Sequence, residues 1–275
     1  MKVMKTITRD EFSPSIVVDE LLDGAGVIML KDVFSPERIK RIAQTIEAET
    51  DEAIDTGSHF NQNAQDPLLQ RRVWFTRLVE LDPDIASLVE EPMIFQSMQA
   101  FLGKEFVMGS MCASRIMPGY GGQEPHIDYP YWDFYRNETF PTRTNSSFPL
   151  NAQAIILIDE FTDENGATAL APGSQKDLRY PDKNDDFFGK CIRLTGKPGD
   201  VVLFFGAAWH CAMPNQSEAG RIGILVEFLP KFVTPIEDLL KDLDENYLKG
   251  TTPEMQQLLG MKYPWPSTPP HPPIQ

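Results

Sequence analysis

The sequence predicts an α+β protein whose core is rich in β-strands. Helical periodicity dominates the first hundred or so residues, whereas short β-rich runs follow one another from residue 105 to residue 230. Turn signals such as PGYGG, DENG and KPGD separate these runs. Many short strands with glycine and proline between them are typical of an antiparallel sandwich or barrel. Because the helices come mainly first, the class is α+β with a β core.

The N-terminal part contains a strand-like stretch and two helical regions. Residues 24–33, GAGVIMLKDV, form an apolar run. A helix is predicted to begin at Pro36 with Ser35 as its N-cap, and Glu37 complements the helix dipole there. A second helical region, DPDIASLVEEPMIFQSMQAFLG, is expected to end at Gly103. The first helix is expected to pack inward through side chains at helical spacing, namely Ile39, Ile42, Ala43 and Ile46.

The β-rich region and the tail complete a single predicted domain over residues 1–275. The predicted strands are FVMGSMCASRIM, LNAQAIILID, ATALAP, KCIRLTG, DVVLFFG, WHCAM and RIGILVEFL. We place a helical support at about 1–104, the β core at 105–230 and a helical, proline-rich tail at 231–275. The tail holds two short amphipathic helices and ends in residues expected to be loosely ordered. It is expected to pack on its own domain or on a second chain, as in a homodimer.

Composition and charge exclude several classes of protein. The formal net charge is −15 and the sequence contains no basic stripe, which argues against a nucleic-acid partner. No run approaches the roughly 20 apolar residues of a membrane span, and the first twenty residues lack a signal-peptide core. The three cysteines fit neither a disulfide framework nor a zinc finger. A reducing compartment, and hence a cytoplasmic location, is expected.

The stretch GGQEPHIDYPYWDFY contains the first candidate site residues, His126 and Asp128. On a strand, residues i and i+2 project from the same face, so this pair can point into one cavity. A single H-x-D is unremarkable by itself. Of the other histidines, His59 lies in a polar stretch and His271 in the proline tail, and neither is assigned a function. His210 follows an apolar strand and completes two histidines and one carboxylate, the facial triad of non-haem Fe(II) oxygenases.

Arg221 lies eleven residues after His210, beyond the turn PNQSEAG. We expect an antiparallel hairpin that places the guanidinium a few residues along the neighbouring strand, roughly 10 Å from the histidine. A five-carbon diacid that chelates a metal at one end and pairs with arginine at the other fits this gap. The alternative is an arginine at a surface strand end. Arg115, on the strand before MPGYGG, is a further candidate for the cavity.

In this order, HID, DENGATALAPGSQ, GDVVLFFGAAWH and the following arginine resemble the phytanoyl-CoA dioxygenase family over most of the chain. Its members are Fe(II)- and 2-oxoglutarate-dependent oxygenases on a double-stranded β-helix, or jelly roll. The resemblance therefore implies a jelly-roll core flanked by N-terminal and C-terminal helices. It further implies that three residues bind Fe(II) and that Arg221 binds the C5 carboxylate of 2-oxoglutarate. The three implied metal ligands are His126, Asp128 and His210.

The resemblance also suggests weaker cosubstrate contacts. Thr168 matches a position that touches the cosubstrate in several relatives, although it is equally an ordinary strand threonine. Relatives often carry a serine where this chain has Ala212, and Gln123 is the suggested replacement for it. Among the aromatic residues that follow the H-x-D pair, Tyr129 and Trp132 are expected to line a substrate pocket. The alternative is that alternate rings of this cluster simply fill the core.

The implied reaction consumes O₂ and 2-oxoglutarate, releases succinate and CO₂, and oxidises a C–H bond of a small molecule, most simply by hydroxylation. The acidic chain has no basic patch for the phosphates of CoA, so a natural-product or lipid-like intermediate is the expected substrate. Two alternatives stay open. One is a zinc hydrolase or isomerase on a cupin-like fold that uses the same three ligands but needs no dicarboxylate anchor. The other is a non-catalytic jelly-roll binding module whose site has decayed.

Overall fold

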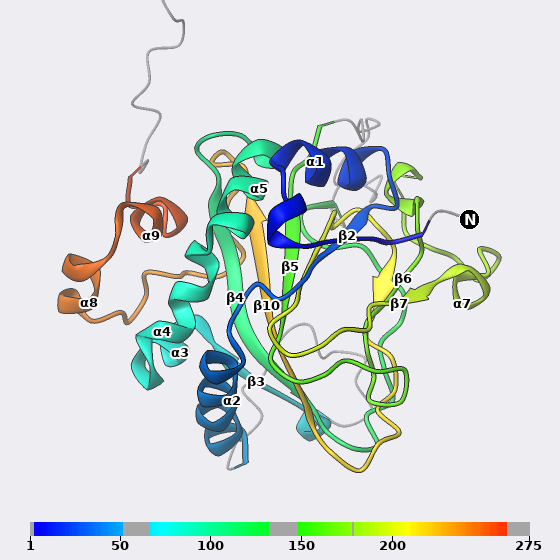
Figure 1. Ribbon diagram of the computed structural model, residues 1–275, viewed down its shortest axis with the longest axis horizontal. Helices are drawn as coiled ribbons and strands as arrows, with labels where there is room; N and C mark the ends of the chain where they lie inside the picture. Colours follow the sequence, from blue (N-terminus) through cyan, green and yellow to red (C-terminus); the bar gives the residue numbers. More distant parts are fainter. Residues whose placement is uncertain (1–2, 52–66, 132–147, 178, 263–275) are drawn as a thin grey trace, which may run out of the picture.

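A seven-stranded sheet forms the main layer of the computed structural model, which describes residues 3–51, 67–131, 148–177 and 179–262 (Figure 1). Neighbouring strands are antiparallel except for β1 and β2, which are parallel. In spatial order the strands are β1 (Lys5–Ile7), β2 (Val27–Leu30), β8 (Val201–Phe204), β5 (Ala152–Leu157), β10 (Arg221–Leu229), β4 (Val107–Ile116) and β3 (Gln70–Trp74).

A second, three-stranded sheet faces the main one. Its antiparallel strands are β7 (Ile192–Arg193), β6 (Ala169–Leu170) and β9 (His210–Cys211), in that order. Along the chain, β5, β8 and β10 belong to the main sheet, whereas β6, β7 and β9 belong to the minor one. This alternation winds the chain around the space between the sheets and confirms the predicted jelly roll. An apolar cluster fills part of that space, including Val27, Ile155, Phe161, Leu170 and Val202.

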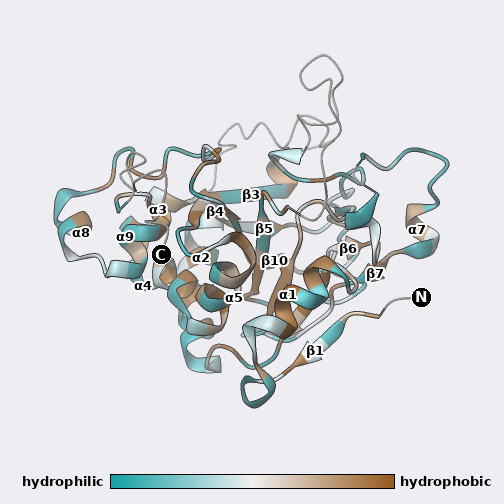
Figure 2. Cartoon of the chain, turned by 90° about the horizontal axis from the view of Figure 1, so that it is seen from above, coloured by the Kyte–Doolittle hydropathy of each residue, from teal (hydrophilic) through white to brown (hydrophobic). Residues whose placement is uncertain are grey.

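Most helices lie on the side of the main sheet away from β6 and β7, whereas α7 (Phe187–Lys190) lies beside β7 (Figure 1). Figure 2 shows hydrophobic residues gathered in the central strands and hydrophilic ones on outlying helices such as α8. The α-helices are α1 (Pro14–Leu22), α2 (Pro36–Asp51), α3 (Phe75–Leu81), α4 (Pro83–Ala86), α5 (Pro92–Leu102), α7 (Phe187–Lys190), α8 (Glu245–Gly250) and α9 (Pro253–Leu258). The 3₁₀ helices are η1 (Arg9–Glu11), η3 (Pro67–Leu69), η4 (Ser87–Glu90) and η5 (Ser174–Lys176). Within the described ranges, no helix is long and apolar enough to cross a bilayer.

Most predicted elements are present. Each strand expected between residues 105 and 230 forms, and α2 begins at Pro36 and buries Ile39, Ile42 and Ile46. The first 104 residues, expected to be mainly helical, also supply three strands of the main sheet. Two of these, β1 and β3, were not predicted, because KTI has only three residues and QRRVW is short and contains only two apolar residues.

The tail packs on its own domain. Helix α9 buries Met255 and Leu258, and the side-chain amide of Gln257 donates to the carbonyls of Lys104 and Phe106 at 3.1 Å each. The apolar face of this helix is therefore used within the chain. The homodimer stays a prediction.

Glu237 lies in the segment before α8 and hydrogen-bonds to β4 at a point where that strand is irregular. Its carboxylate accepts a hydrogen bond from the N–H of Met111 at 3.2 Å, and its own N–H donates to the carbonyl of Gly109 at 3.2 Å. The register between β4 and β10 shifts at this point. Burial raises the pKa of Glu237 to about 7, although hydrogen bonds from backbone N–H groups oppose the shift.

We expect Glu237→Gln to change how stability depends on pH. In the unfolded chain a glutamate ionises near pH 4.3, whereas in the folded protein this one holds its proton up to about pH 7. Between about pH 4.3 and pH 7 the folded state therefore binds one proton more than the unfolded state. The stability that this proton contributes is lost as the pH rises through this range. The free energy of unfolding of the variant, relative to the parent, should rise by about 2 kcal/mol from pH 5 to pH 8 in urea titrations.

The matched control for this prediction is Glu245→Gln, which removes a glutamate whose side chain is 85% exposed. Its difference from the parent should change little with pH over the same range. If the free energy of unfolding of Glu237→Gln, relative to the parent, is equally independent of pH, the inferred shift in pKa is wrong.

Candidate active site

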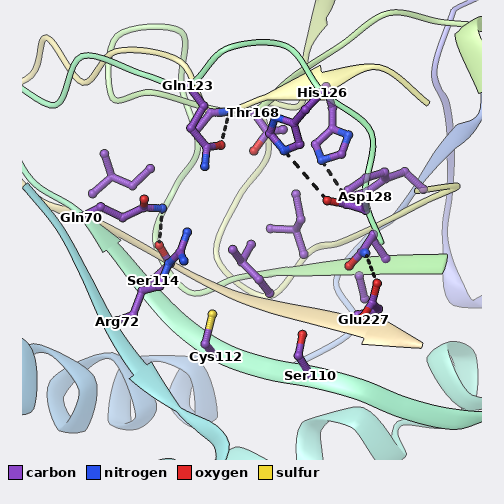
Figure 3. A pocket seen from close by; sticks show the side chains of 18 of the residues that line it. Gln70, Arg72, Ser110, Cys112, Ser114, Gln123, His126, Asp128, Thr168 and Glu227 are labelled. Atoms are coloured by element: carbon purple, nitrogen blue, oxygen red, sulfur yellow. Dashed lines mark hydrogen bonds and ion pairs between the residues drawn. The ribbon is translucent and has the colours of Figure 1, made fainter. Parts of the chain in front are cut away.

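His126 and His210 face each other from two backbone segments joined by an antiparallel bridge. The N–H of His126 donates to the carbonyl of His210 at 2.9 Å, and the reverse hydrogen bond measures 3.0 Å. Two residues further on, the N–H of Asp128 donates to the carbonyl of Gly206 at 2.9 Å. The geometry of a strand had been assumed for the H-x-D pair, but the pair does not lie in a regular strand. Within residues 121–131, the bridge at His126 is the only β-type pairing. Both side chains nevertheless converge on the same point (Figure 3).

The two imidazoles are oriented by backbone carbonyls. Nδ1 of His126 lies 2.8 Å from the carbonyl oxygen of Glu124, and Nδ1 of His210 lies 2.9 Å from that of Ala208. This leaves each Nε2 facing Asp128, at 3.9 Å from Oδ1 for His126 and 3.2 Å from Oδ2 for His210. The ligand atoms of the three residues lie within 4.8 Å of one another. No other group of three potential metal ligands among the described residues meets this condition.

The electrostatics of the triad favour a neutral His126 and a charged Asp128, as metal binding requires, whereas His210 has to release its proton to a metal. Burial, and then the neighbouring His210, lower the pKa of His126 to about 4, so its ring is neutral near pH 7. Burial opposes charge on Asp128 and His210, but their mutual attraction outweighs it. The pKa of Asp128 is therefore lowered and that of His210 is raised. Imidazole nitrogens held by backbone carbonyls, together with a carboxylate, are a donor set for a divalent transition metal.

Arg221, the first residue of β10, is a buried cation at the other side of the site. It is 3% exposed, its Nη2 donates to the carbonyl of Gly166 at 2.8 Å, and its guanidinium carbon lies 3.9 Å from the ring centroid of Phe161. Burial lowers its pKa to about 9, which still leaves it charged near pH 7. Among the described residues, no carboxylate lies within 4 Å of it. A buried charge without a counter-ion is costly, so an anionic ligand would stabilise it.

The predicted hairpin between His210 and Arg221 is wrong. β9 belongs to the minor sheet and β10 to the main sheet, so the connecting segment crosses from one sheet to the other. The two residues face the same cavity because the sheets themselves face each other. His210 and Arg221 thus line one cavity, although the topology differs from the predicted one.

The cavity has a volume of about 130 Å³ and is lined by the triad, Arg221, Gln123, Thr168 and Tyr129. Oε1 of Gln123 accepts a hydrogen bond from the N–H of Ala212 at 3.1 Å (Figure 3), which leaves its Nε2 for a ligand. Thr168 is 8% exposed, and the hydroxyl of Tyr129 donates to the carbonyl of Thr234 at 2.8 Å. Three residues considered from the sequence lie outside the described residues, namely Trp132, His59 and His271.

Arg115 does not face the cavity. Its guanidinium donates to the carboxylate of Asp51 at 2.5 Å and to the hydroxyl of Thr50 at 3.2 Å, both at the end of α2. Side chains alternate along a strand, and the neighbouring Ser114 is the one that lines the cavity. The prediction that Arg115 faces the cavity is therefore wrong, and Ser114, one residue earlier, faces it instead.

The sequence analysis did not identify several residues that line the cavity. These residues belong to strands of the main sheet, which forms the floor of the cavity. A period of two in QRRVW and in SMCAS was the available signal, because alternate residues of these stretches share a face. The side-chain amide of Gln70 donates to the hydroxyl of Ser114 at 3.2 Å (Figure 3), and Arg72 is a second buried cation, 7% exposed. The floor residues are Gln70, Arg72, Trp74, Ser110, Cys112, Ser114, Gln153, Ile155, Leu225 and Glu227.

Comparison with known proteins agrees with this fold. "Dioxygenase cdmA" of Talaromyces verruculosus is 26% identical over 264 residues, which cover 91% of this chain and 84% of that protein. EctD from S. alaskensis, solved with 2-oxoglutarate and 5-hydroxyectoine, superposes with a TM-score of 0.59 at 18% identity, covering 79% of this chain and 76% of that one. The epimerase SnoN, solved with Fe³⁺, alpha ketoglutarate and nogalamycin RO, gives 0.58 at 15% identity, covering 88% and 94%. The two solved structures share the fold.

The sequence profile of one family, phytanoyl-CoA dioxygenase, matches residues 22–223. The matched range runs from the end of α1 into the start of β10, so it includes the minor sheet, most strands of the main sheet and every candidate ligand described above. The chain therefore belongs to the phytanoyl-CoA dioxygenase family, which confirms the resemblance and the predicted class of enzyme, a non-haem dioxygenase.

Proposed function

We propose that this dioxygenase uses Fe(II) and 2-oxoglutarate to hydroxylate a C–H bond of a small, mostly apolar molecule. The observation that carries the proposal is the pairing, in one cavity, of a two-histidine, one-carboxylate cluster with a buried arginine. The donor set fits Fe(II), because two imidazole nitrogens and a carboxylate would hold this metal once His210 has released its proton. The arginine fits the distal carboxylate of the cosubstrate, because its charge is buried.

Each residue has a separate task in this proposal. His126, Asp128 and His210 would hold the metal, and the carbonyls of Glu124 and Ala208 keep the two rings in the required tautomer. With both present, iron and 2-oxoglutarate use O₂ to yield succinate, CO₂ and the oxidant for the substrate.

Several side chains would bind the cosubstrate, 2-oxoglutarate. Arg221 would pair with its C5 carboxylate, while Gly166 and Phe161 hold the guanidinium in place. The side-chain amide of Gln123 and the hydroxyl of Thr168, which both line the cavity, would hydrogen-bond to it. Tyr129, whose hydroxyl is already used by Thr234, would present its ring to the substrate.

The chemistry of the chain favours a free small molecule over a CoA thioester. The net charge of −15 gives no basic surface for the phosphates of CoA. EctD was solved with 5-hydroxyectoine and SnoN with nogalamycin RO, both small organic molecules. A zinc hydrolase or isomerase is not favoured, because it has no use for a buried arginine such as Arg221.

Turnover of 2-oxoglutarate tests the proposal without knowledge of the substrate. Protein loaded with Fe(II) and given 2-oxoglutarate and O₂ should release succinate slowly in the absence of substrate, and His210→Ala should not. Succinate is measured by chromatography with mass detection. An iron-loaded parent that forms no more succinate than His210→Ala would contradict the proposal.

A further inference from the structure

One end of the cavity floor carries a row of polar side chains that the proposed chemistry does not use. Gln153 of β5, Glu227 of β10 and Ser110 of β4 are register partners, and all three line the cavity. The next row that faces the cavity along these strands is apolar. It consists of Ile155, Leu225 and Cys112, with Trp74 of β3 beside Cys112.

Glu227 is a buried carboxyl with little internal pairing. It is 4% exposed, its Oε1 accepts a hydrogen bond from Nε2 of Gln153 at 3.3 Å (Figure 3), and its buried Oε2 has no hydrogen-bond partner. Gly109 leaves room for it, since a Cβ at that position would lie 2.6 Å from Oε2. Burial, and then the charge of Asp128, raise the pKa of Glu227 well above its usual range, although the amides of Asn151 and Gln153 oppose the shift. The shift favours the neutral, protonated form of this carboxyl.

The other two members of the row have spare hydrogen-bonding capacity. In the described part of the chain, the hydroxyl of Ser110 makes no hydrogen bond, and Gln153 uses one N–H of its amide, toward Glu227. A hydroxyl and an amide carry no charge, and the burial of Glu227 favours the neutral form of its carboxyl. The row thus offers hydrogen bonds to a neutral group.

Buried polar groups that lack partners reduce the stability of a protein, and this row concentrates such groups on the cavity side of three adjacent strands. We propose that Gln153, Glu227 and Ser110 bind a neutral oxygen, such as that of a ketone, ester or alcohol, on an otherwise apolar substrate. The carbon skeleton would lie on the apolar row of Ile155, Leu225, Cys112 and Trp74. This proposal rests on the proposed function and adds to it the class of substrate.

Charged substrate groups fit this end of the cavity less well. An anionic group at the row would find no cation among Gln153, Glu227 and Ser110 to pair with. A cationic group would share the cavity with the guanidinium groups of Arg72 and Arg221. A neutral oxygen needs no counter-ion and avoids this repulsion.

The first test compares the stability of the metal-free parent with that of Glu227→Met and Glu227→Gln. Methionine matches glutamate in length without its hydrogen-bonding groups, and glutamine keeps both a donor and an acceptor. If the carboxyl serves a ligand and not the fold, the urea midpoints of both variants should equal or exceed that of the parent. Midpoints lowered in both variants would assign Glu227 to the fold and overturn the proposal.

The second test measures ligand binding by ligand-observed NMR, with cyclohexanone and cyclohexylammonium as probes. Cyclohexanone should bind the parent and Glu227→Gln within about threefold of each other, and Glu227→Met at least about tenfold more weakly. Glu237→Gln, which removes a carboxyl outside the cavity, is the matched control and should bind like the parent. Equal binding of cyclohexanone by all four proteins would overturn the proposal. So would a preference for cyclohexylammonium that Glu227→Gln abolishes, because that result indicates an ion pair.

Neither measurement requires iron or 2-oxoglutarate. A failure of the proposed cofactor chemistry would appear in succinate release and not in these data. If Gln153, Glu227 and Ser110 do not bind a neutral oxygen, the stability and NMR binding data would show it, while succinate release would persist. The two proposals can therefore fail separately.

Discussion

Asp128→Ala should weaken Fe(II) binding by at least about 100-fold. The substitution removes one of the three proposed ligands, and it also removes the negative charge that favours a divalent cation between the two imidazoles. Asp128 is the residue that both histidine Nε2 atoms face. Anaerobic calorimetric titration of Fe(II) into the metal-free protein measures the loss.

Glu124→Gln is the matched control for this prediction. It removes a negative charge four residues away, from an exposed side chain, and keeps the backbone carbonyl that orients His126. Its Fe(II) affinity should stay within about threefold of that of the parent. If both variants lose affinity equally, the effect comes from net charge, and the assignment of Asp128 as a ligand is wrong.

Arg221→Leu should weaken binding of 2-oxoglutarate to the iron-loaded protein by about 100-fold, as expected for the loss of a buried, charge-assisted pair. Arg221→Lys should recover only part of the affinity. A lysine keeps the charge but cannot form the bidentate contact, and it cannot reproduce the guanidinium that lies 3.9 Å from the ring centroid of Phe161. Affinity is measured under anaerobic conditions by equilibrium dialysis.

Two further readouts separate this role of Arg221 from a structural one. Fe(II) affinity should change by no more than about threefold in Arg221→Leu, because the arginine is not a ligand. Without cosubstrate, the variant should be at least as stable as the parent, since it no longer buries a cation that lacks a counter-ion. Arg77→Leu, at a side chain that is 50% exposed, should leave cosubstrate affinity unchanged. Strong destabilisation of Arg221→Leu with unchanged cosubstrate affinity would contradict the account.

The sequence predicted the strands of the β core and the three residues that cluster as potential metal ligands. These features depend on local periodicity and on residue types that are rare in the chain, such as its four histidines. The topology could not be read in the same way. The hairpin expected between His210 and Arg221 is a crossing between sheets, because hydrophobic alternation shows which face a residue occupies but not which sheet its strand joins.

The cavity floor was missed for a related reason. Arg72 and Glu227 are charged residues in strands, and sequence alone favours an exposed position for such side chains. Their burial follows from strand partners that are distant in sequence, with Arg72 opposite Ser114 and Glu227 opposite Gln153. Arg115 illustrates the opposite error, since it lies one residue from the cavity-facing Ser114 and points to α2 instead.

Anaerobic addition of Fe(II) and 2-oxoglutarate to the metal-free protein, followed by visible absorption, tests the central claim most directly. A chelate between the metal and the cosubstrate gives a charge-transfer band, which neither component gives alone. The account predicts that the band forms in the parent, is absent in Asp128→Ala and needs far more 2-oxoglutarate in Arg221→Leu. Absence of the band in a folded parent that binds Zn(II) tightly would contradict the oxygenase and favour the zinc hydrolase.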